Sequence, residues 1–137
     1  NSAADISLSV LACHHLPQVL AAVAVYDGGL PLVDNLAAMS SAAAGMRCAS
    51  VHQSREGATW TSGGWRTAPA VDIYAGVAAA VDDSCGPTTE IVTVVYDRDR
   101  DVDVERIRQA ASTASHGCDV QLFAGRPSNA VVSIGVE

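Results

Sequence analysis

Hydrophobic and polar positions near the start of the chain favour extended structure. Residues 6–12 (ISLSVLA) begin by alternating between apolar and polar side chains, and residues 19–26 (VLAAVAVY) form a β-rich apolar run. Between them, Pro17 lacks the backbone N–H that a central strand needs. We therefore expect two strands joined by a turn that contains His14 and His15.

Three later segments carry apolar residues at steps of three and four, which is the period of an amphipathic helix. They cover residues 31–45, 69–81 and 102–116, and Asp101 or Asp103 can cap the third helix by accepting backbone N–H bonds. The apolar stripes consist of Leu32, Leu36, Met39, Ala43 and Met46; of Val71, Tyr74, Val77, Ala78 and Val81; and of Val104, Ile107, Ala111 and Ala114.

The remaining β-rich segments predict short strands. These are residues 47–52, a hairpin over 59–67 that turns at Gly63 and Gly64, and residues 90–96, 118–124 and 131–136. A strand, a helix and a second strand in succession favour a parallel pair. The sequence therefore predicts a single α/β domain over 1–137, with one mixed β-sheet covered by about three Ala-rich helices and a C-terminal βαββ unit.

Composition excludes several classes of protein. The chain has 137 residues, is 49% hydrophobic and 17% charged, and carries a net charge of −7, with arginine as its only strongly basic residue. A nucleic-acid binder needs a basic face, which this balance argues against. No apolar run approaches the roughly 20 residues that cross a bilayer. We expect no cofactor, because neither glycine pair belongs to a phosphate-binding loop.

Four cysteines, Cys13, Cys48, Cys85 and Cys118, are spread along the chain at near-regular intervals. An even number permits three disulfide pairings if the protein is extracellular. Free cysteines also occur as small buried apolar residues. The sequence leaves both interpretations open, and all four remain possible disulfide cysteines.

Other polar clusters do not match an established metal or catalytic site. Cys48 with His52, and His116 with Cys118, lack the spacing of zinc ligands. The acidic run over 97–105 begins like a calcium loop but lacks the required glycine and the terminal glutamate. No serine lies in a nucleophile elbow. We therefore predict no catalytic residue and no metal ligand.

Trp60 and Trp65 flank the predicted turn at Gly63 and Gly64, so their indoles lie on one face of the hairpin. Paired tryptophans on a loop can anchor a protein partner. A pair of this kind can also close over the edge of its own core. Both interpretations stay open, and Trp60 and Trp65 are the candidate partner-binding residues.

The order of elements and several short strings resemble the soluble domain of EccE, a core component of the actinobacterial ESX (type VII) secretion apparatus. The strings include residues 30–32 and 36–37, Cys48–Ser54, Val71–Tyr74 and residues 106–121, together with the strand pair predicted before them. The resemblance implies a non-enzymatic interaction domain on the cytoplasmic side of a membrane-associated complex. Its partners would be protein subunits of that complex.

Two other functions fit the residues without this resemblance. The cysteines are compatible with a secreted, disulfide-stabilised protein that binds a ligand or inhibits an enzyme. The many serines and cysteines leave open a small hydrolase or metal-dependent enzyme.

Overall fold

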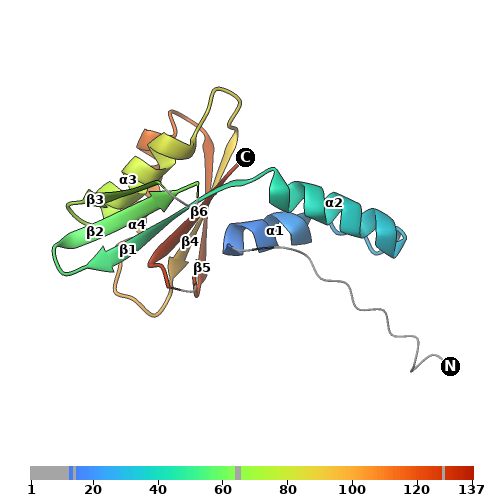
Figure 1. The fold of residues 1–137 in the computed structure, drawn as a ribbon, viewed down its shortest axis with the longest axis horizontal. Coiled ribbons are helices and arrows are strands. Elements are labelled where there is room, and N and C mark those ends of the chain that lie inside the picture. The colour runs from blue at the N-terminus through green and yellow to red at the C-terminus, as the bar shows by residue number, and fades with distance from the viewer. Residues whose placement is uncertain (1–12, 14, 64–65, 128) are drawn as a thin grey trace.

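The computed structural model describes residue 13 and residues 15–63, 66–127 and 129–137. Its helices are α1 (Leu16–Ala24), α2 (Leu32–Ala44), α3 (Ile73–Ser84) and α4 (Val104–Ala114), and its strands are β1 (Arg47–Ser54), β2 (Gly57–Ser62), β3 (Arg66–Ala70), β4 (Ile91–Asp97), β5 (Asp119–Gly125) and β6 (Val132–Val136). The strands form one sheet in the order β3-β2-β1-β6-β4-β5 (Figure 1).

The sheet is mixed, which confirms the predicted fold class. β4 and β5 are parallel, whereas β4 with β6, β6 with β1, β1 with β2 and β2 with β3 are antiparallel. The predicted βαββ unit consists of β4, α4, β5 and β6. Its last strand inserts between β1 and β4, so the C-terminal segment joins the two halves of the sheet.

The core lies between one face of the sheet and the helices α3 and α4. Val77 and Val81 of α3 and Ile107 of α4 are fully buried there, against Val94 and Ile134 of the central strands. Neighbouring positions of a strand face opposite sides of the sheet, so Ile134 faces this core and Gly135 lies on the other face. Of the apolar stripes predicted for these two helices, Val77, Val81, Ile107 and Ala111 lie in the buried core.

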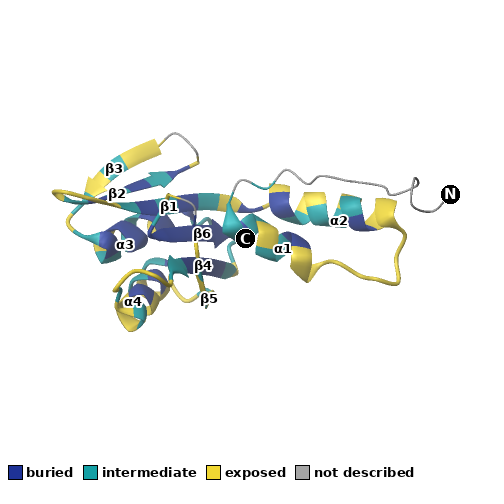
Figure 2. Cartoon of the chain, turned by 90° about the horizontal axis from the view of Figure 1, so that it is seen from below, coloured by how far each residue is buried: buried dark blue, intermediate teal, exposed yellow. Residues whose placement is uncertain are grey.

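Helices α1 and α2 form a hairpin beside this two-layer body. α1 contacts β4 and β6 on the face opposite α3, while α2 packs mainly on α1 and extends beyond the sheet (Figures 1 and 2). The strand predicted over 19–26 is therefore wrong, because that segment belongs largely to α1. The strand predicted over 6–12 lies outside the described residues.

The start of α1 explains why this segment is helical. Pro17 lies in the first turn, where its missing N–H costs nothing, and the Gln18 side chain accepts a hydrogen bond from the backbone N–H of His15 at 3.1 Å. The run that follows contains three alanines, which have the highest helix propensity. These local signals outweigh the β-propensity of the interspersed valines.

The predicted start of the second long helix at Pro69 is also wrong. Pro69 lies in β3, an edge strand that tolerates a missing backbone donor. The helix instead begins at Ile73, because the Asp72 side chain accepts a hydrogen bond from the N–H of Ala75 at 2.8 Å. Val71, which was expected on the buried stripe, is 84% exposed.

The acidic run between β4 and α4 makes local structural contacts. Asp97 accepts a bond from the N–H of Asp99, and Asp99 pairs with Arg126 at 2.9 Å. Of the two predicted caps, Asp103 is the one used, since it accepts from the N–H groups of Glu105 and Arg106. These carboxylates order the loop and the start of α4.

Candidate functional site

The interface between α1 and α2 contains small and polar side chains rather than large apolar ones. Ala22 and Ala43 are each 2% exposed, and Asn35 is 3% exposed. Alanines let the two helices approach closely, but they bury little apolar area. The hairpin therefore holds its shape without burying its larger hydrophobic residues.

Hydrogen bonds fix the hairpin at both ends. The Asn35 amide donates to the carbonyl of Asp27 at 2.8 Å, and its oxygen accepts from the N–H of Asp27 at 2.9 Å. At the other end, Gln18 Nε2 donates to the carbonyl of Ala43 at 3.2 Å. Because buried amides need partners, these bonds define the turn and the register of the two helices.

The outer surface of the hairpin is apolar. Seven of the nine exposed large hydrophobic residues in the described part of the chain belong to α1, α2 or their connection. We call these seven the hairpin surface: Val19, Val23, Val25, Tyr26, Leu30, Leu32 and Val33. Val23 is 60% and Val33 70% exposed. Figure 2 shows the exposed positions running along both helices to the end of the hairpin away from the sheet.

Clustered exposure of this kind has a functional meaning. Single exposed valines are normal, whereas contiguous apolar patches on soluble domains mark sites of association. Val19 and Val23 are one helical turn apart on α1 and share a face. The hairpin surface is the strongest candidate binding surface among the described residues.

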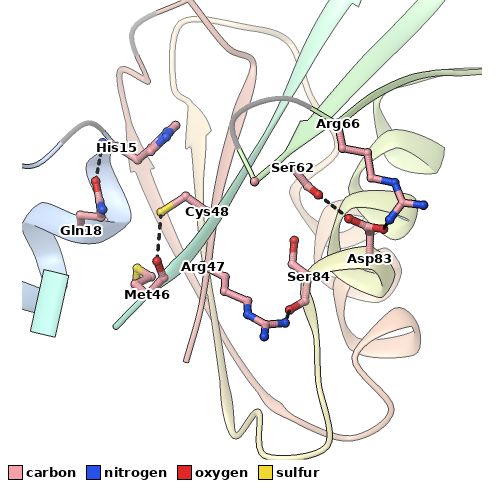
Figure 3. A pocket seen from close by; sticks show the side chains of 10 residues that line it. His15, Gln18, Met46, Arg47, Cys48, Ser62, Arg66, Asp83 and Ser84 are labelled. Carbon is pink, nitrogen blue, oxygen red and sulfur yellow. Dashed lines mark hydrogen bonds and ion pairs between the residues drawn. The ribbon is translucent and has the colours of Figure 1, made fainter. Parts of the chain in front are cut away.

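A pocket of about 520 Å³ lies where the hairpin meets the sheet. Figure 3 shows that it is lined from α1, β1, β2 and the end of α3. Asp83 accepts a hydrogen bond from the Ser62 hydroxyl and pairs with Arg66 at 2.7 Å. Arg47 donates to the carbonyl of Ser84 at 3.4 Å. The polar groups of the pocket are thus bonded to one another, and they link β2 and β1 to α3.

The Ser62 hydroxyl of the pocket is not arranged as a catalytic nucleophile. It donates directly to the Asp83 carboxylate, whereas covalent catalysis by serine uses a histidine base that the carboxylate orients. Burial, and then the neighbouring Cys13 thiol, raise the pKa of Cys48 from 9.0 to about 11. A thiol with such a pKa stays protonated at neutral pH and is a poor nucleophile.

The predicted tryptophan pair is only partly described. Trp60 belongs to the core cluster and is 9% exposed, opposite Val51 in the register of β1 and β2. Trp65 lies outside the described residues. Little of the Trp60 indole is available to a partner, and the role of the pair as an anchor stays a prediction.

The four cysteines are free thiols that the fold groups in pairs. Burial first, and then the nearby Cys13 thiol, raise the pKa of Cys48, while burial first, and then the nearby Cys118 thiol, raise the pKa of Cys85. Sequence spacing could not reveal these pairings, because the segments that carry each pair meet only in the folded sheet. Within the described ranges, no group of three or more His, Cys, Asp or Glu is placed to hold a metal ion.

No helix in the described part of the chain is both long and apolar enough to cross a membrane. Residues 1–137 match the profile of the FakA-like C-terminal family, where FakA denotes one of the subunits of fatty acid kinase. The chain belongs to this family. No curated protein matches it at a significant level.

This assignment corrects the functional expectations. The resemblance to the EccE domain is wrong, because the family that matches the whole chain is a different one. The predicted role in type VII secretion and the predicted partners, subunits of a membrane export complex, are wrong with it. The family also gives no support to the two alternatives, a secreted inhibitor and a small hydrolase. The strings that suggested EccE lie mostly in helices and strands, whose short apolar patterns recur in unrelated folds.

Proposed function

We propose that this chain is the docking domain of a FakA-type subunit of fatty acid kinase, and that its hairpin surface binds a partner subunit that carries the fatty acid. The domain itself transfers no phosphoryl group. The proposal combines the family assignment with the exposed apolar surface of α1 and α2.

The chemistry of the substrate supports a partner of this kind. FakA is one of several subunits of its kinase, and a fatty acid is too apolar to be presented to the enzyme unshielded. A carrier that encloses the acyl chain must bind the kinase while the carboxylate is phosphorylated. An apolar docking surface on the kinase provides that contact through buried side chains.

The polar groups of the domain support a binding role rather than catalysis. Ser62, Asp83 and Arg66 are bonded to one another, and Arg47 is bonded to a backbone carbonyl. Phosphoryl transfer needs positive groups directed at a phosphate and a loop that cradles it. Here these arginines serve the packing of strands against α3.

The test uses the complete FakA-type protein together with the fatty-acid-binding subunit of the same kinase, loaded with a long-chain fatty acid. Val23→Asp and Val33→Asp each place a charge on the hairpin surface. We expect each to weaken binding about tenfold or more, as charges at the centre of an interface do. Affinity is measured by isothermal titration calorimetry. In the phosphorylation assay, KM for the loaded partner rises and kcat at saturation is unchanged.

Val71→Asp is the matched control, because Val71 is 84% exposed and lies away from the hairpin. It should bind like the unaltered protein. Unchanged affinity of both hairpin variants would contradict the proposal. A second result would also contradict it: the hairpin variants retain partner affinity, but the rest of the FakA-type protein is digested faster in limited proteolysis. That result would show that the hairpin surface packs against another part of its own chain.

A further inference from the structure

Cys85 and Cys118 lie at the two ends of the segment that contains β4 and α4. Cys85 is the C-terminal cap of α3, where its N–H donates to the carbonyl of Val81, and Cys118 directly precedes β5. Both side chains are half-buried and pack against the core. The two cysteines are far apart in sequence but meet at the edge of the sheet where β4 and β5 begin.

Thr89 lies between Cys118 and the turn that follows Cys85. The Cys118 thiol donates to the carbonyl of Thr89 at 3.2 Å, and the Thr89 hydroxyl accepts from the N–H of Gly86 at 2.8 Å. A backbone bond from Thr89 N–H to the Gly86 carbonyl closes the turn that follows Cys85. The N–H of Asp119 donates to the carbonyl of Glu90, which fixes the strand start beside it. Cys85 and Cys118 are thus held on either side of one short turn.

We propose that Cys85 and Cys118 form a reversible dithiol–disulfide pair that closes the β4–α4 segment at its base. The Cys118 thiol is hydrogen-bonded to the carbonyl of Thr89, and Thr89 closes the turn that follows Cys85, so both cysteines lie beside the same short turn, where a bond between them can form. The sequence permitted three pairings of the four cysteines, and the fold selects Cys85 with Cys118. The remaining two, Cys13 and Cys48, are then left as neighbours of each other.

The oxidant is a small-molecule disulfide such as oxidised glutathione. One protein thiolate attacks it, which forms a mixed disulfide and releases one small thiol. The second protein thiolate then displaces the other small thiol. The protein loses two protons and two electrons, and the two released small thiols carry them away.

Closing this loop restrains the unfolded chain more than the folded one. The segment between the two cysteines contains β4, which pairs with β6 on one side and with the edge strand β5 on the other. We expect oxidation to raise the Tm by roughly 5 to 15 °C, the shift that corresponds to a disulfide across a loop of intermediate length. Reduction should reverse the shift.

Digestion with trypsin identifies which cysteines are linked, because at least one arginine lies between each cysteine and the next. Cleavage after these arginines yields 1–47, 48–55, 67–98 and 109–137, each with one cysteine, since the bond before Pro127 resists cleavage. The complete chain is equilibrated in glutathione buffers, alkylated, digested without reduction and analysed by mass spectrometry. We expect 67–98 linked to 109–137 and the link lost on reduction.

Two variants and a denatured sample complete the test. Cys13→Ser/Cys48→Ser should retain the link and the Tm shift, whereas Cys118→Ser should lose both. Protein oxidised in urea should give mixed pairings. Alkylation of Cys85 and Cys118 in the most oxidising buffer, or a link from peptide 67–98 or 109–137 to either of the other two peptides in the folded protein, would overturn the proposal. Binding of the fatty-acid carrier is not part of this readout, so the outcome is independent of the proposed function.

Discussion

Asn35 and Cys48 show how burial gives single polar residues their roles. Asn35 is 3% exposed and makes two hydrogen bonds with Asp27, so it orders the turn of the hairpin. Cys48 lies on β1 opposite Gly135 of β6, on the face that α1 covers. Desolvation there favours its neutral thiol, because a buried thiolate loses the hydration that stabilises its charge.

The pKa of Cys48 predicts its reactivity. With the pKa raised from 9.0 to about 11, first by burial and then by Cys13, the thiolate is rare at pH 8. We expect iodoacetamide to alkylate Cys48 of the reduced, folded protein about 100-fold more slowly than an ordinary cysteine at that pH. The tryptic peptide 48–55 reports the rate, and unfolding in urea should restore ordinary reactivity.

The same shift has a consequence for stability. The folded pKa lies above the unfolded one, so the folded state favours the proton at this site. The stabilisation is complete below pH 9.0 and is lost as the pH rises through about 11. Urea unfolding between these values should show a steeper loss in the unaltered protein than in Cys48→Ser. Equal slopes would show that Cys48 is not responsible.

At the scale of elements, the ends of the helices depend on individual side chains. α3 begins after Asp72 and α4 after Asp103, and in each case the carboxylate accepts from backbone N–H groups in the first turn. α1 uses Pro17 and Gln18 for the same purpose. These capping residues decide where the helices begin more closely than the apolar stripes do.

Asp103→Ala should destabilise the domain by about 0.5–2 kcal/mol, because two N–H groups at the start of α4 lose their acceptor. Asp101→Ala is the control, since it removes a nearby exposed carboxylate in the same loop that accepts no hydrogen bond from a described residue. Chemical denaturation measures both variants. Equal effects would mean that loss of charge, rather than of the cap, is responsible.

At the scale of the whole molecule, the hairpin makes an especially close contact with the sheet at Gly135. Gly135 is the penultimate residue of β6, where an added Cβ would lie 2.5 Å from the Pro17 Cβ and would also clash with the sulfur of Met46. Only a residue without a side chain lets the start of α1 approach the sheet this closely. The position of the hairpin surface relative to the core therefore depends on a glycine in the sheet.

Gly135→Ala should weaken the contact between β6 and the start of α1. Overpacking at a close-packed site costs about 1–3 kcal/mol. We expect faster amide hydrogen exchange in α1 and at Met46, with exchange in α3 and α4 unchanged. Gly86→Ala is the matched control, because an added Cβ there comes no closer than 3.8 Å to Arg47. Uniform loss of protection across the domain would show that the hairpin does not move as a separate unit.

The sequence by itself determined the α/β class, the βαββ unit and the three longer helices. It also narrowed the cap of α4 to Asp101 or Asp103. These follow from local periodicity and capping, which depend on residues close together in the chain. It did not determine α1, because valines and alanines in a short run permit a strand or a helix. The structure shows that the Pro17 and Gln18 signals at its start prevail, and that α1 packs on α2 and lies close to Gly135.

The tertiary structure decided the candidate sites. Stripe position predicted Leu32 to be buried, yet it is 53% exposed, because α2 packs on α1 instead of lying on the sheet. Trp60 was a candidate for the surface and lies in the core. The proposed pairing of Cys85 with Cys118 depends on the start of β5 lying beside Thr89. Exposure and proximity depend on contacts between distant segments, so no pattern along the chain could supply them.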